Sequence, residues 1–352
     1  MSEKTVTNNQ KADLLSREVA HIDITSFDAR PIVAAMERMS FSSRELGRAS
    51  RIYNRMLGDP DCTIMLTLAG STSAGGCMNL YADLVRNNMV DCIVATGASI
   101  VDMDFFEGLG FKHYQAADRV DDERLRSLYI DRIYDTYIDE EDLQSCDMTI
   151  REIADGLPGG VYSSRRFIRQ MGRYLAENGR KDNALVKLAW EHDVPIFCPA
   201  FSDSSAGFGL VKHQVEKIRK NEPYVSIDSV ADFRELTEIK IRSGTTGLLM
   251  IGGGVPKNFA QDTVVCAEIL GAEDVEMHKY AVQITVADMR DGACSSSTLK
   301  EACSWGKVSP VEEQMVFAEA TTVLPLLASD AYHRGAWKER RKRRLATIFD
   351  AG

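Results

Sequence analysis

One short stretch near the carboxyl terminus, Ser304-Trp305-Gly306-Lys307, carries residue types suited to amine chemistry. A lysine attacks a carbonyl or imine carbon only when it is neutral, so its pKa must fall through burial or a neighbouring cation. Trp305 offers a π-face to a cationic amine, and Glu301 could pair with a second ammonium. An exposed lysine beside a half-buried tryptophan is the commoner arrangement, so from residue types alone both interpretations stay open.

Loops of small residues follow several apolar runs, and such loops could accept a cofactor. Residues 69–76 follow the apolar run 62–68, and their small side chains would let the backbone approach a pyrophosphate closely. A tight turn explains this composition equally well, because the loop spells no dinucleotide or ATP fingerprint. Gly252-Gly253-Gly254 is more specific, since three glycines permit backbone contact with a ligand or positive φ. Asp203 could accept ribose hydroxyls, hold an ammonium, or only cap a turn or helix.

The elements that must position these residues alternate between buried strands and helices. Short apolar runs without polar alternation are typical of strands buried on both faces of a parallel sheet. The predicted strands cover residues 62–68, 89–96, 194–198, 247–251 and 280–286. With the intervening helical segments they predict a doubly wound α/β fold, with a mainly parallel sheet and helices on both faces. The small-residue loops would then lie at the carboxyl ends of the strands, where such sheets bind ligands.

Most of the chain, residues 21–335, is expected to form a single α/β domain, because 352 residues suffice for one large core. Residues 1–20 are expected to be a flexible leader, and residues 336–352 a basic tail. The charge-rich segment 118–147 is interpreted as an excursion from the sheet. The basic cluster 338–344 could contact RNA or an acidic partner, but a solvated or frayed helical end is the simpler interpretation.

Composition and charge narrow the functional class. A net charge of −10 disfavours non-specific nucleic-acid binding and mildly attracts cations. The sequence has no apolar run of membrane-spanning length and no signal-peptide core, so we expect a cytoplasmic protein without a membrane partner. Eight cysteines without zinc-ligand spacing indicate reduced thiols and no structural metal. The six histidines give zinc enzymes and serine hydrolases little support.

The Ser304–Lys307 stretch resembles deoxyhypusine synthase, and other segments agree with that family in order. These are residues 88–91, 199–203 and 252–257, and Glu319-Ala320 followed by 324–326. The pattern as a whole is similar to the bacterial deoxyhypusine synthase-like branch. The resemblance implies a Rossmann-like fold, NAD as the cofactor, and a homotetramer whose active sites lie at a dimer interface.

The resemblance also implies a reaction: an NAD-dependent aminoalkyl transfer acting on a polyamine or related amine. In the family, a hydride leaves the secondary-amine carbon of spermidine, 1,3-diaminopropane departs, and the aminobutyl group passes to a lysine as a Schiff base. Lys307 is the residue assigned to this covalent step. The acceptor would be a translation-factor lysine in deoxyhypusine synthase, or putrescine in a homospermidine synthase. A non-catalytic NAD-binding regulatory protein is the alternative from another class.

Positions for the cofactor and the amine also follow from the resemblance. Cofactor contacts fall on Gly70, Ser71, Thr72, Ser73, Thr96, Gly97, Ala98, Asp102, Asp203, Val286, Ala287, Glu319 and Ala320. Amine contacts fall on Gly253, Asn258, Glu301 and Trp305. Asp102 stands in place of a family glutamate, and Glu319 in place of an aspartate.

The departures from the family concern the groups that bind the amine. Phe208 and Cys294 stand where eukaryotic synthases have aspartates that bind substrate ammonium groups, and Asn258 replaces a histidine. Each lost ammonium–carboxylate pair removes about 1.5–3 kcal/mol of binding. The sequence therefore predicts an altered amine, and it favours a small-molecule acceptor over a translation factor. The acids considered as replacements are Asp104, Asp288 and Asp291.

Overall fold

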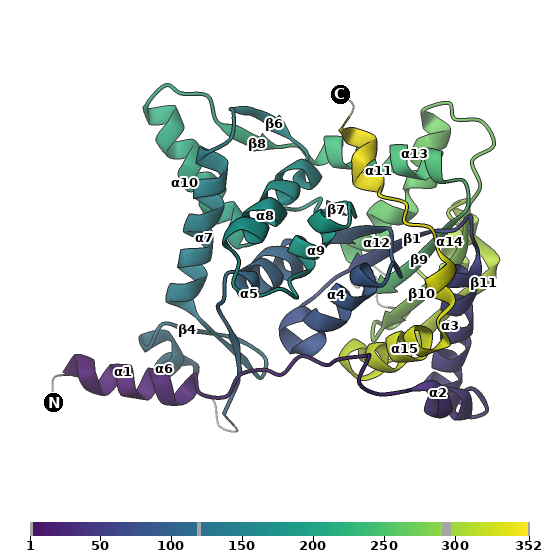
Figure 1. Cartoon of the computed structure of the whole chain (residues 1–352), viewed down its shortest axis with the longest axis horizontal. Coiled ribbons are helices and arrows are strands. Elements are labelled where there is room, and N and C mark those ends of the chain that lie inside the picture. The colour runs from purple at the N-terminus through teal and green to yellow at the C-terminus, as the bar shows by residue number, and fades with distance from the viewer. Residues whose placement is uncertain (1–2, 118–120, 291–296, 351–352) are drawn as a thin grey trace.

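A six-stranded, wholly parallel sheet forms the centre of the molecule (Figure 1). The computed structural model describes residues 3–117, 121–290 and 297–350. The strand order is β11-β10-β9-β1-β2-β7. The strands are β1 Thr63–Leu68, β2 Cys92–Ala95, β7 Ile196–Phe197, β9 Thr246–Ile251, β10 His278–Thr285 and β11 Val308–Phe317. The predicted α/β class with a mainly parallel sheet is confirmed.

Helices cover both faces of this sheet, which explains why its central strands read as unbroken apolar runs. Every residue of β1 and β9 is buried. Alternate residues of β1 enter different cores: Leu66 packs in the larger one and Met65 in the smaller one. The larger core is covered by α3 (Phe41–Gly58), α4 (Met78–Arg86), α8 (Ser164–Asn178), α9 (Leu185–Glu191) and α15 (Ala320–Arg334). The smaller is covered by α11 (Ser229–Ser243), α12 (Gly254–Gln261) and α14 (Leu299–Ser304).

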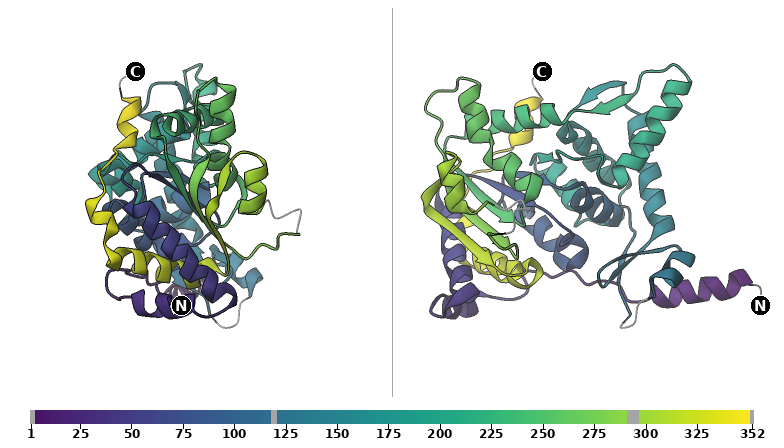
Figure 2. Two further views of the ribbon diagram at one scale, coloured as in Figure 1. Left: turned by 90° about the vertical axis from the view of Figure 1, so that its right-hand side faces the viewer. Right: turned by 180° about the vertical axis from the view of Figure 1, so that it is seen from behind.

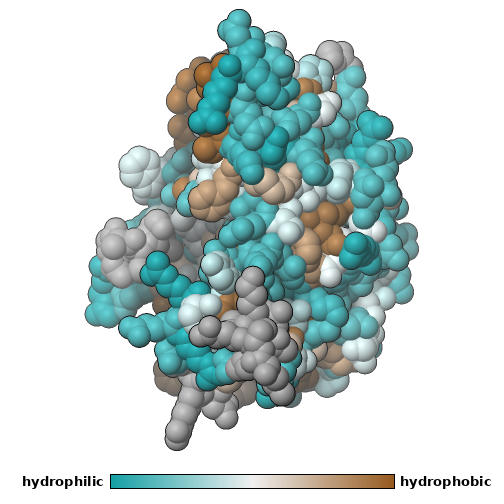
Figure 3. Space-filling view, turned by 90° about the vertical axis from the view of Figure 1, so that its left-hand side faces the viewer, coloured by the Kyte–Doolittle hydropathy of each residue, from teal (hydrophilic) through white to brown (hydrophobic). Residues whose placement is uncertain are grey.

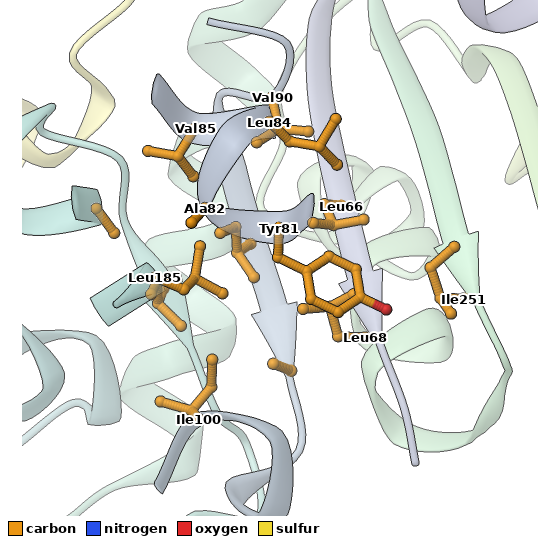
Figure 4. Close-up of a cluster of buried hydrophobic side chains, with 14 of the residues drawn as sticks. Leu66, Leu68, Tyr81, Ala82, Leu84, Val85, Val90, Ile100, Leu185 and Ile251 are labelled. Carbon is orange, nitrogen blue, oxygen red and sulfur yellow. The ribbon is translucent and has the colours of Figure 1, made fainter. Parts of the chain in front are cut away.

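Helix α4 illustrates how the larger core is built (Figure 4). Its apolar residues Tyr81, Leu84 and Val85 are each at most 1% exposed. Their partners from the strands include Leu66 and Ile251, so α4 lies over the junction between β1 and its neighbours. The π-helix η1 (Ser73–Cys77) connects β1 to this helix.

The segment after β2 leaves the main sheet, as the sequence predicts. Its elements are π-helix η2 (Ala98–Phe105), α5 (Phe106–Gly108), β3 (His113–Gln115), α6 (Asp122–Ser127), β4 (Ile130–Ile133), β5 (Thr136–Asp139) and α7 (Glu140–Asp155). Strands β3, β5 and β4 form a small antiparallel sheet. This sheet lies on the side of the molecule opposite β11 (Figure 2).

The remaining elements connect or cover these layers. They are α1 (Glu3–Leu14), α2 (Arg30–Glu37), α10 (Ser205–Arg219), α13 (Thr263–Ile269), the parallel pair β6 (Gly160–Tyr162) and β8 (Val225–Ile227), and the 3₁₀ turns η3 (Ala336–Glu339) and η4 (Leu345–Phe349). In the described ranges, no helix is both long and apolar enough to cross a bilayer.

The expectation of a flexible leader over residues 1–20 is wrong for its second half. Lys11 on α1 contacts Asp139 at 2.7 Å and Glu141 at 2.8 Å. The backbone N–H of Val19 donates to the carbonyl of His113, the first residue of β3, at 2.9 Å. The leader is thus attached to the small antiparallel sheet, because its charged residue meets the acidic start of α7.

The expectation of a free basic tail over residues 336–352 is also wrong. Arg340 is buried against Asp91, and Arg344 contacts Asp193 at 2.7 Å. Leu345 joins the smaller core, and the guanidinium of Arg165 lies 4.2 Å from the centroid of the Phe349 ring. Part of the basic cluster is therefore used inside the molecule, because buried carboxylates at the sheet need cationic partners.

Candidate active site

The carboxyl ends of the parallel strands bring the predicted cofactor residues to one edge of the sheet. Residues 70–73 follow β1, residues 96–98 follow β2, and Asp203 follows β7. Residues 286–287 follow β10, and residues 319–320 follow β11. Five separate predictions from the sequence therefore meet at one edge, which we call the carboxyl edge.

Direct contacts hold two of these loops together. The Ser99 hydroxyl donates to the Gly70 carbonyl at 2.9 Å, and the Thr96 hydroxyl donates to the Ser99 hydroxyl at 3.2 Å. A Cβ on Gly97 would lie 2.5 Å from the Cβ of Ser204, closer than real Cβ contacts allow. Glycine is required at position 97 because the loops after β2 and β7 pack against each other there.

A cavity of about 570 Å³ opens at this edge beside the loop after β7. Its lining is rich in carboxylates and contains one exposed aromatic ring, that of Phe208. The acids are Asp102, Asp131, Glu140, Asp147 and Asp203. Such a lining suits a cationic ligand more than an anionic one, because each carboxylate gains by pairing with an ammonium.

Several of the cavity carboxylates have raised pKa values. Burial raises the pKa of Asp102 to about 6, although the Ser205 N–H donates to it at 2.7 Å, and the charge of Asp203 raises it further. Burial, with the charge of Asp102, raises the pKa of Asp147 to about 7. These acids therefore become charged near neutral pH, where a protonated amine could neutralise them.

Glu319 has a structural role at the carboxyl edge. Its side chain caps α15, accepting from the Thr321 N–H at 2.9 Å and the Thr322 N–H at 3.0 Å. Partial burial opposes ionisation, but the hydrogen bonds from Thr321 and Thr322 lower its pKa overall. The carboxylate is thus fixed, and contact with a cofactor would have to use the same oxygens or the backbone of Ala320.

Lys307 lies at the other end of the sheet, immediately before β11. Gly306 adopts φ +71°, and its N–H donates to the Cys303 carbonyl at 3.0 Å. The Lys307 N–H donates to the Ala302 carbonyl at 3.0 Å. This pair of bonds is a Schellman motif, which ends α14 and explains the glycine of the Trp-Gly-Lys stretch. The His278 N–H then donates to the Lys307 carbonyl at 2.9 Å, so the lysine backbone is fixed on both sides.

The amine of Lys307 has an aromatic and an anionic neighbour. Its Nζ contacts the carboxylate of Asp262 and lies 5.3 Å from the centroid of the Trp305 ring. The Lys307 side chain is 17% exposed, whereas Trp305 is 68% exposed. The tryptophan therefore covers part of the amine and leaves most of its own surface for a ligand.

Of the other predicted amine contacts, Asn258 lies on α12, between the two edges. Gly253 precedes the helix at the carboxyl edge, and Asn258 lies one turn before Asp262, whose N–H donates to the Asn258 carbonyl at 2.8 Å. Glu301 lies on α14, where it forms a capping box with Thr298. The hydrogen bonds from Thr298 lower the pKa of Glu301, so its carboxylate is charged but already has partners.

The structure does not bring Lys307 and the cofactor residues of the same chain together. The ten-residue strand β11 separates Lys307 from Glu319, and ten extended residues span about 30 Å. Lys307, Trp305 and Asp262 thus form a second group, at what we call the amino edge.

The residues at the carboxyl edge fit NAD. Helix η1 begins at Ser73, directly after the β1 loop. The first N–H groups of a helix have no partner within it, although that of Gly75 already donates to the Ser71 carbonyl at 3.2 Å. Such groups suit pyrophosphate oxygens. The exposed carboxylate of Asp203 suits ribose hydroxyls. In the described ranges, no group of three His, Cys, Asp or Glu side chains is placed to hold a metal ion.

Two of the acids considered as replacements for the lost family carboxylates, Asp104 and Asp288, have other partners in the structure. Asp104 is fully buried and accepts the N–H groups of Leu185 and Val186 at the start of α9. Asp288 pairs with Arg290 at 2.8 Å on the surface. Asp291 and Cys294 lie outside the described residues.

Four acids near the two groups were not singled out from the sequence: Asp131, Glu140, Asp147 and Asp262. The helical spacing from Asn258 to Asp262 is a signal that could have found the last of them, because residues four apart share a helix face. The other three come from the excursion after β2, and their approach to Phe208 depends on how α7 packs against α10.

Comparison with known proteins identifies the family of the chain. The deoxyhypusine synthase family profile matches residues 31–331. The chain belongs to the deoxyhypusine synthase family. The resemblance stated from the sequence is therefore confirmed. The family is one of transferases that move an aminobutyl group.

Relatives from bacteria and archaea cover nearly the whole chain. The chain is 70% identical to a deoxyhypusine synthase-like protein of Coxiella burnetii, with 96% of both chains covered. It is 68% identical to a deoxyhypusine synthase-like protein of Caulobacter vibrioides, covering 98% of this chain and 94% of the relative. It is 37% identical to a protein named probable deoxyhypusine synthase 2 from Methanosarcina mazei, covering 93% and 92%.

A solved structure shares the fold. The crystal structure of a protein assigned as deoxyhypusine synthase from Entamoeba histolytica aligns with a TM-score of 0.59 and 20% sequence identity. The alignment covers 90% of this chain and 97% of the other. The architecture of the family is thus retained at low sequence identity.

Proposed function

We propose that the protein is an NAD-dependent aminoalkyl transferase that moves an aminobutyl-type group between amines through a covalent imine on Lys307. The observation that carries this proposal is the division of one parallel sheet into a cofactor-type edge and an edge bearing Lys307, Trp305 and Asp262. Within the family, a nucleophilic lysine with an aromatic cover suits imine chemistry. Bound NAD would supply the hydride acceptor that makes an amine carbon electrophilic.

The strand order supports NAD as the cofactor. Numbered along the chain, the six strands from β7 to β11 run 3-2-1-4-5-6, the order of Rossmann-type doubly wound sheets. In such sheets the ligand lies where the strand order reverses, here between β1 and β9. The loops after these two strands hold residues 70–73 and Gly253, which are candidate ligand contacts.

The carboxylate-lined cavity supports an amine substrate even though the family aspartate is absent at Phe208. Phe208 lines that cavity together with Asp131, Glu140 and Asp147. Carboxylates from α7 and its neighbours would replace the missing one, while the ring would cover the aliphatic part of the amine. A carboxylate-lined cavity of about 570 Å³ has room for a small amine, so we propose a small-molecule acceptor.

The separation of the two groups supports a shared active site, in which one copy provides the cofactor loops and its partner provides Lys307.

An exposed apolar stripe on α10 offers a surface for such assembly: Phe208, Val211, Val215 and Ile218 are each at least 40% exposed. Their spacing places them on one face of the helix. Figure 3 shows apolar side chains near the top of the face that carries α10. Because Phe208 belongs to both the stripe and the cavity, the stripe continues into the site. A homotetramer with sites at dimer interfaces is the proposed assembly.

The covalent step is tested by trapping. Purified protein is incubated with NAD and a panel of polyamines and diamines, reduced with borohydride, digested and examined by mass spectrometry. We expect an aminoalkyl adduct on Lys307 with at least one amine. NAD binding without any adduct on Lys307 across the panel would contradict the proposal and favour a non-catalytic NAD-binding protein.

A further inference from the structure

A carboxylate with no evident structural role contacts the amine of Lys307. Asp262 joins α12 to α13, yet its side chain makes no capping hydrogen bond with α13. Aspartates at helix starts usually accept a backbone N–H. Here the carboxylate instead contacts Lys307 Nζ, which points to a role in the chemistry of that nitrogen.

The other groups around Lys307 leave Asp262 as the contacting anion in the described ranges. Lys257, on α12, is fully buried and donates to the Ser297 carbonyl. Burial lowers the pKa of Lys257 to about 8, with the charge of Lys307 adding to this and that of Glu301 opposing it. The ring of His278, on β10, contacts the Thr246 hydroxyl and the Ala260 carbonyl. Its contact with Lys307 is the hydrogen bond between their backbones.

Imine transfer places a positive charge on the nitrogen of Lys307. Neutral Nζ attacks the carbon of a substrate iminium, a new C–N bond forms, and the bond to the departing amine breaks with its electron pair. One Nζ proton passes to that amine, which leaves neutral, and one proton stays on the new imine. Atoms and charge balance, with the nicotinamide cofactor as the acceptor of the hydride removed earlier.

We propose that Asp262 is the counter-ion of the protonated imine on Lys307. This inference rests on the proposed function and adds a named partner to its covalent step. Only a protonated imine is strongly electrophilic toward the acceptor amine. A carboxylate within about 4–6 Å favours the charged form of such a group by about one to three pH units. Because the Asp262 side chain is 40% exposed, the lower end of that range applies.

The inference is tested with a chromophoric aldehyde that needs neither NAD nor an amine substrate. 4-Dimethylaminocinnamaldehyde forms an imine whose absorption moves to longer wavelength when it is protonated. The midpoint of this spectral change is measured against pH for the wild type, Asp262→Asn and Asp262→Glu. Glu268→Gln is the matched control, since Glu268 is an exposed acid on the next helix. Borohydride reduction and peptide mass spectrometry locate the adduct.

We expect Asp262→Asn to lower the midpoint by about one pH unit. Asp262→Glu, which keeps the charge, should leave the midpoint close to that of the wild type, and Glu268→Gln should leave it unchanged. Asp262→Ser serves as a second variant without the charge, because serine is well accepted at helix starts. An unchanged midpoint in Asp262→Asn or Asp262→Ser, or no aldehyde adduct on Lys307 in the wild type, would overturn the inference. Failure of amine trapping with the shift retained would remove the proposed transferase function alone.

Discussion

The two edges of the central sheet differ in how their chemistry is built. At the carboxyl edge, loops after five strands contribute backbone groups, hydroxyls and carboxylates, and no single side chain dominates. At the amino edge, one lysine with a tryptophan and an aspartate is fixed between a helix end and a strand. The first arrangement suits binding of a large cofactor, and the second suits a single covalent step. Under the proposed function, their separation within one chain would make binding and covalent chemistry meet between copies.

The largest expected effect comes from removing the nucleophile of the amino edge. Lys307→Ala should lower amine-dependent turnover by about a thousandfold or more, while NAD binding stays within about twofold because Lys307 is not one of the predicted cofactor contacts. Stopped-flow absorbance and calorimetry measure the two quantities. Lys300→Ala, an exposed lysine on α14, is the control. Equal loss in both quantities would mean that the edges are not separate.

Mixing chains that are defective at different edges tests whether the two edges act together across copies. Lys307→Ala is combined with a chain carrying Gly97→Val and Asp203→Ala, so that each chain is defective at one edge. A site shared between two copies should return about one quarter of wild-type activity after subunit exchange. Native mass spectrometry verifies the exchange. Mixed assemblies without recovered activity would show that both groups must come from one chain.

A side chain at position 97 should damage the carboxyl edge alone. Gly97→Val forces the loops after β2 and β7 apart, because a Cβ there meets Ser204 at 2.5 Å. We expect NAD binding to weaken by about ten- to a hundredfold, with the aldehyde still reacting at Lys307. Gly58→Ala, where an added Cβ meets nothing within 4 Å, is the control for stability. Unchanged NAD affinity would exclude this edge as the cofactor site.

Loss of the aromatic cover should affect the amine without affecting the fold. Trp305→Ala removes a ring 5.3 Å from Lys307 Nζ, and a cation–π contact contributes about 0.5–2 kcal/mol. We expect KM for the amine to rise by about two- to thirtyfold, with the melting temperature unchanged because the side chain is largely exposed. Val311→Ala on β11, also exposed, is the control. A fall in melting temperature with KM unchanged would assign Trp305 a structural role.

The smallest predicted effect is a pH dependence at the carboxyl edge. Burial first, then the charge of Asp102, raises the pKa of Asp147 to about 7, so this acid becomes charged as the pH rises through that value. Amine binding should tighten between pH 6 and 8, and Asp147→Asn should reduce that gain by about two- to tenfold. Calorimetry with spermidine measures it, and Glu152→Gln on α7 is the control. Equal pH profiles in both variants would exclude Asp147 as an ammonium partner.

Much of the carboxyl edge follows from the sequence, whereas the amino edge does not. Parallel strands buried on both faces leave apolar runs, and their carboxyl ends must coincide, so the loops after β1, β2 and β7 could be grouped in advance. Strand β11 has no such run, because Pro310 and the polar residues after it interrupt the pattern. Without β11, the sequence could not show that Lys307 lies at the opposite edge. The contact with Asp262 depends on the packing of α12 and could be found only from the structure.

The buried pair between Arg340 and Asp91 also affects how the chain is made. Asp91 is 1% exposed and accepts the Ile64 N–H at 2.8 Å, so it holds the start of β1 beside β2. Its cationic partner, Arg340, lies 249 positions later in the chain. If the sheet formed before Arg340 was synthesised, the nascent chain would have to bury the Asp91 carboxylate without its cationic partner, which costs several kcal/mol. The sheet is therefore expected to complete only once Arg340 has been synthesised, and any truncation before residue 340 should leave the chain aggregation-prone.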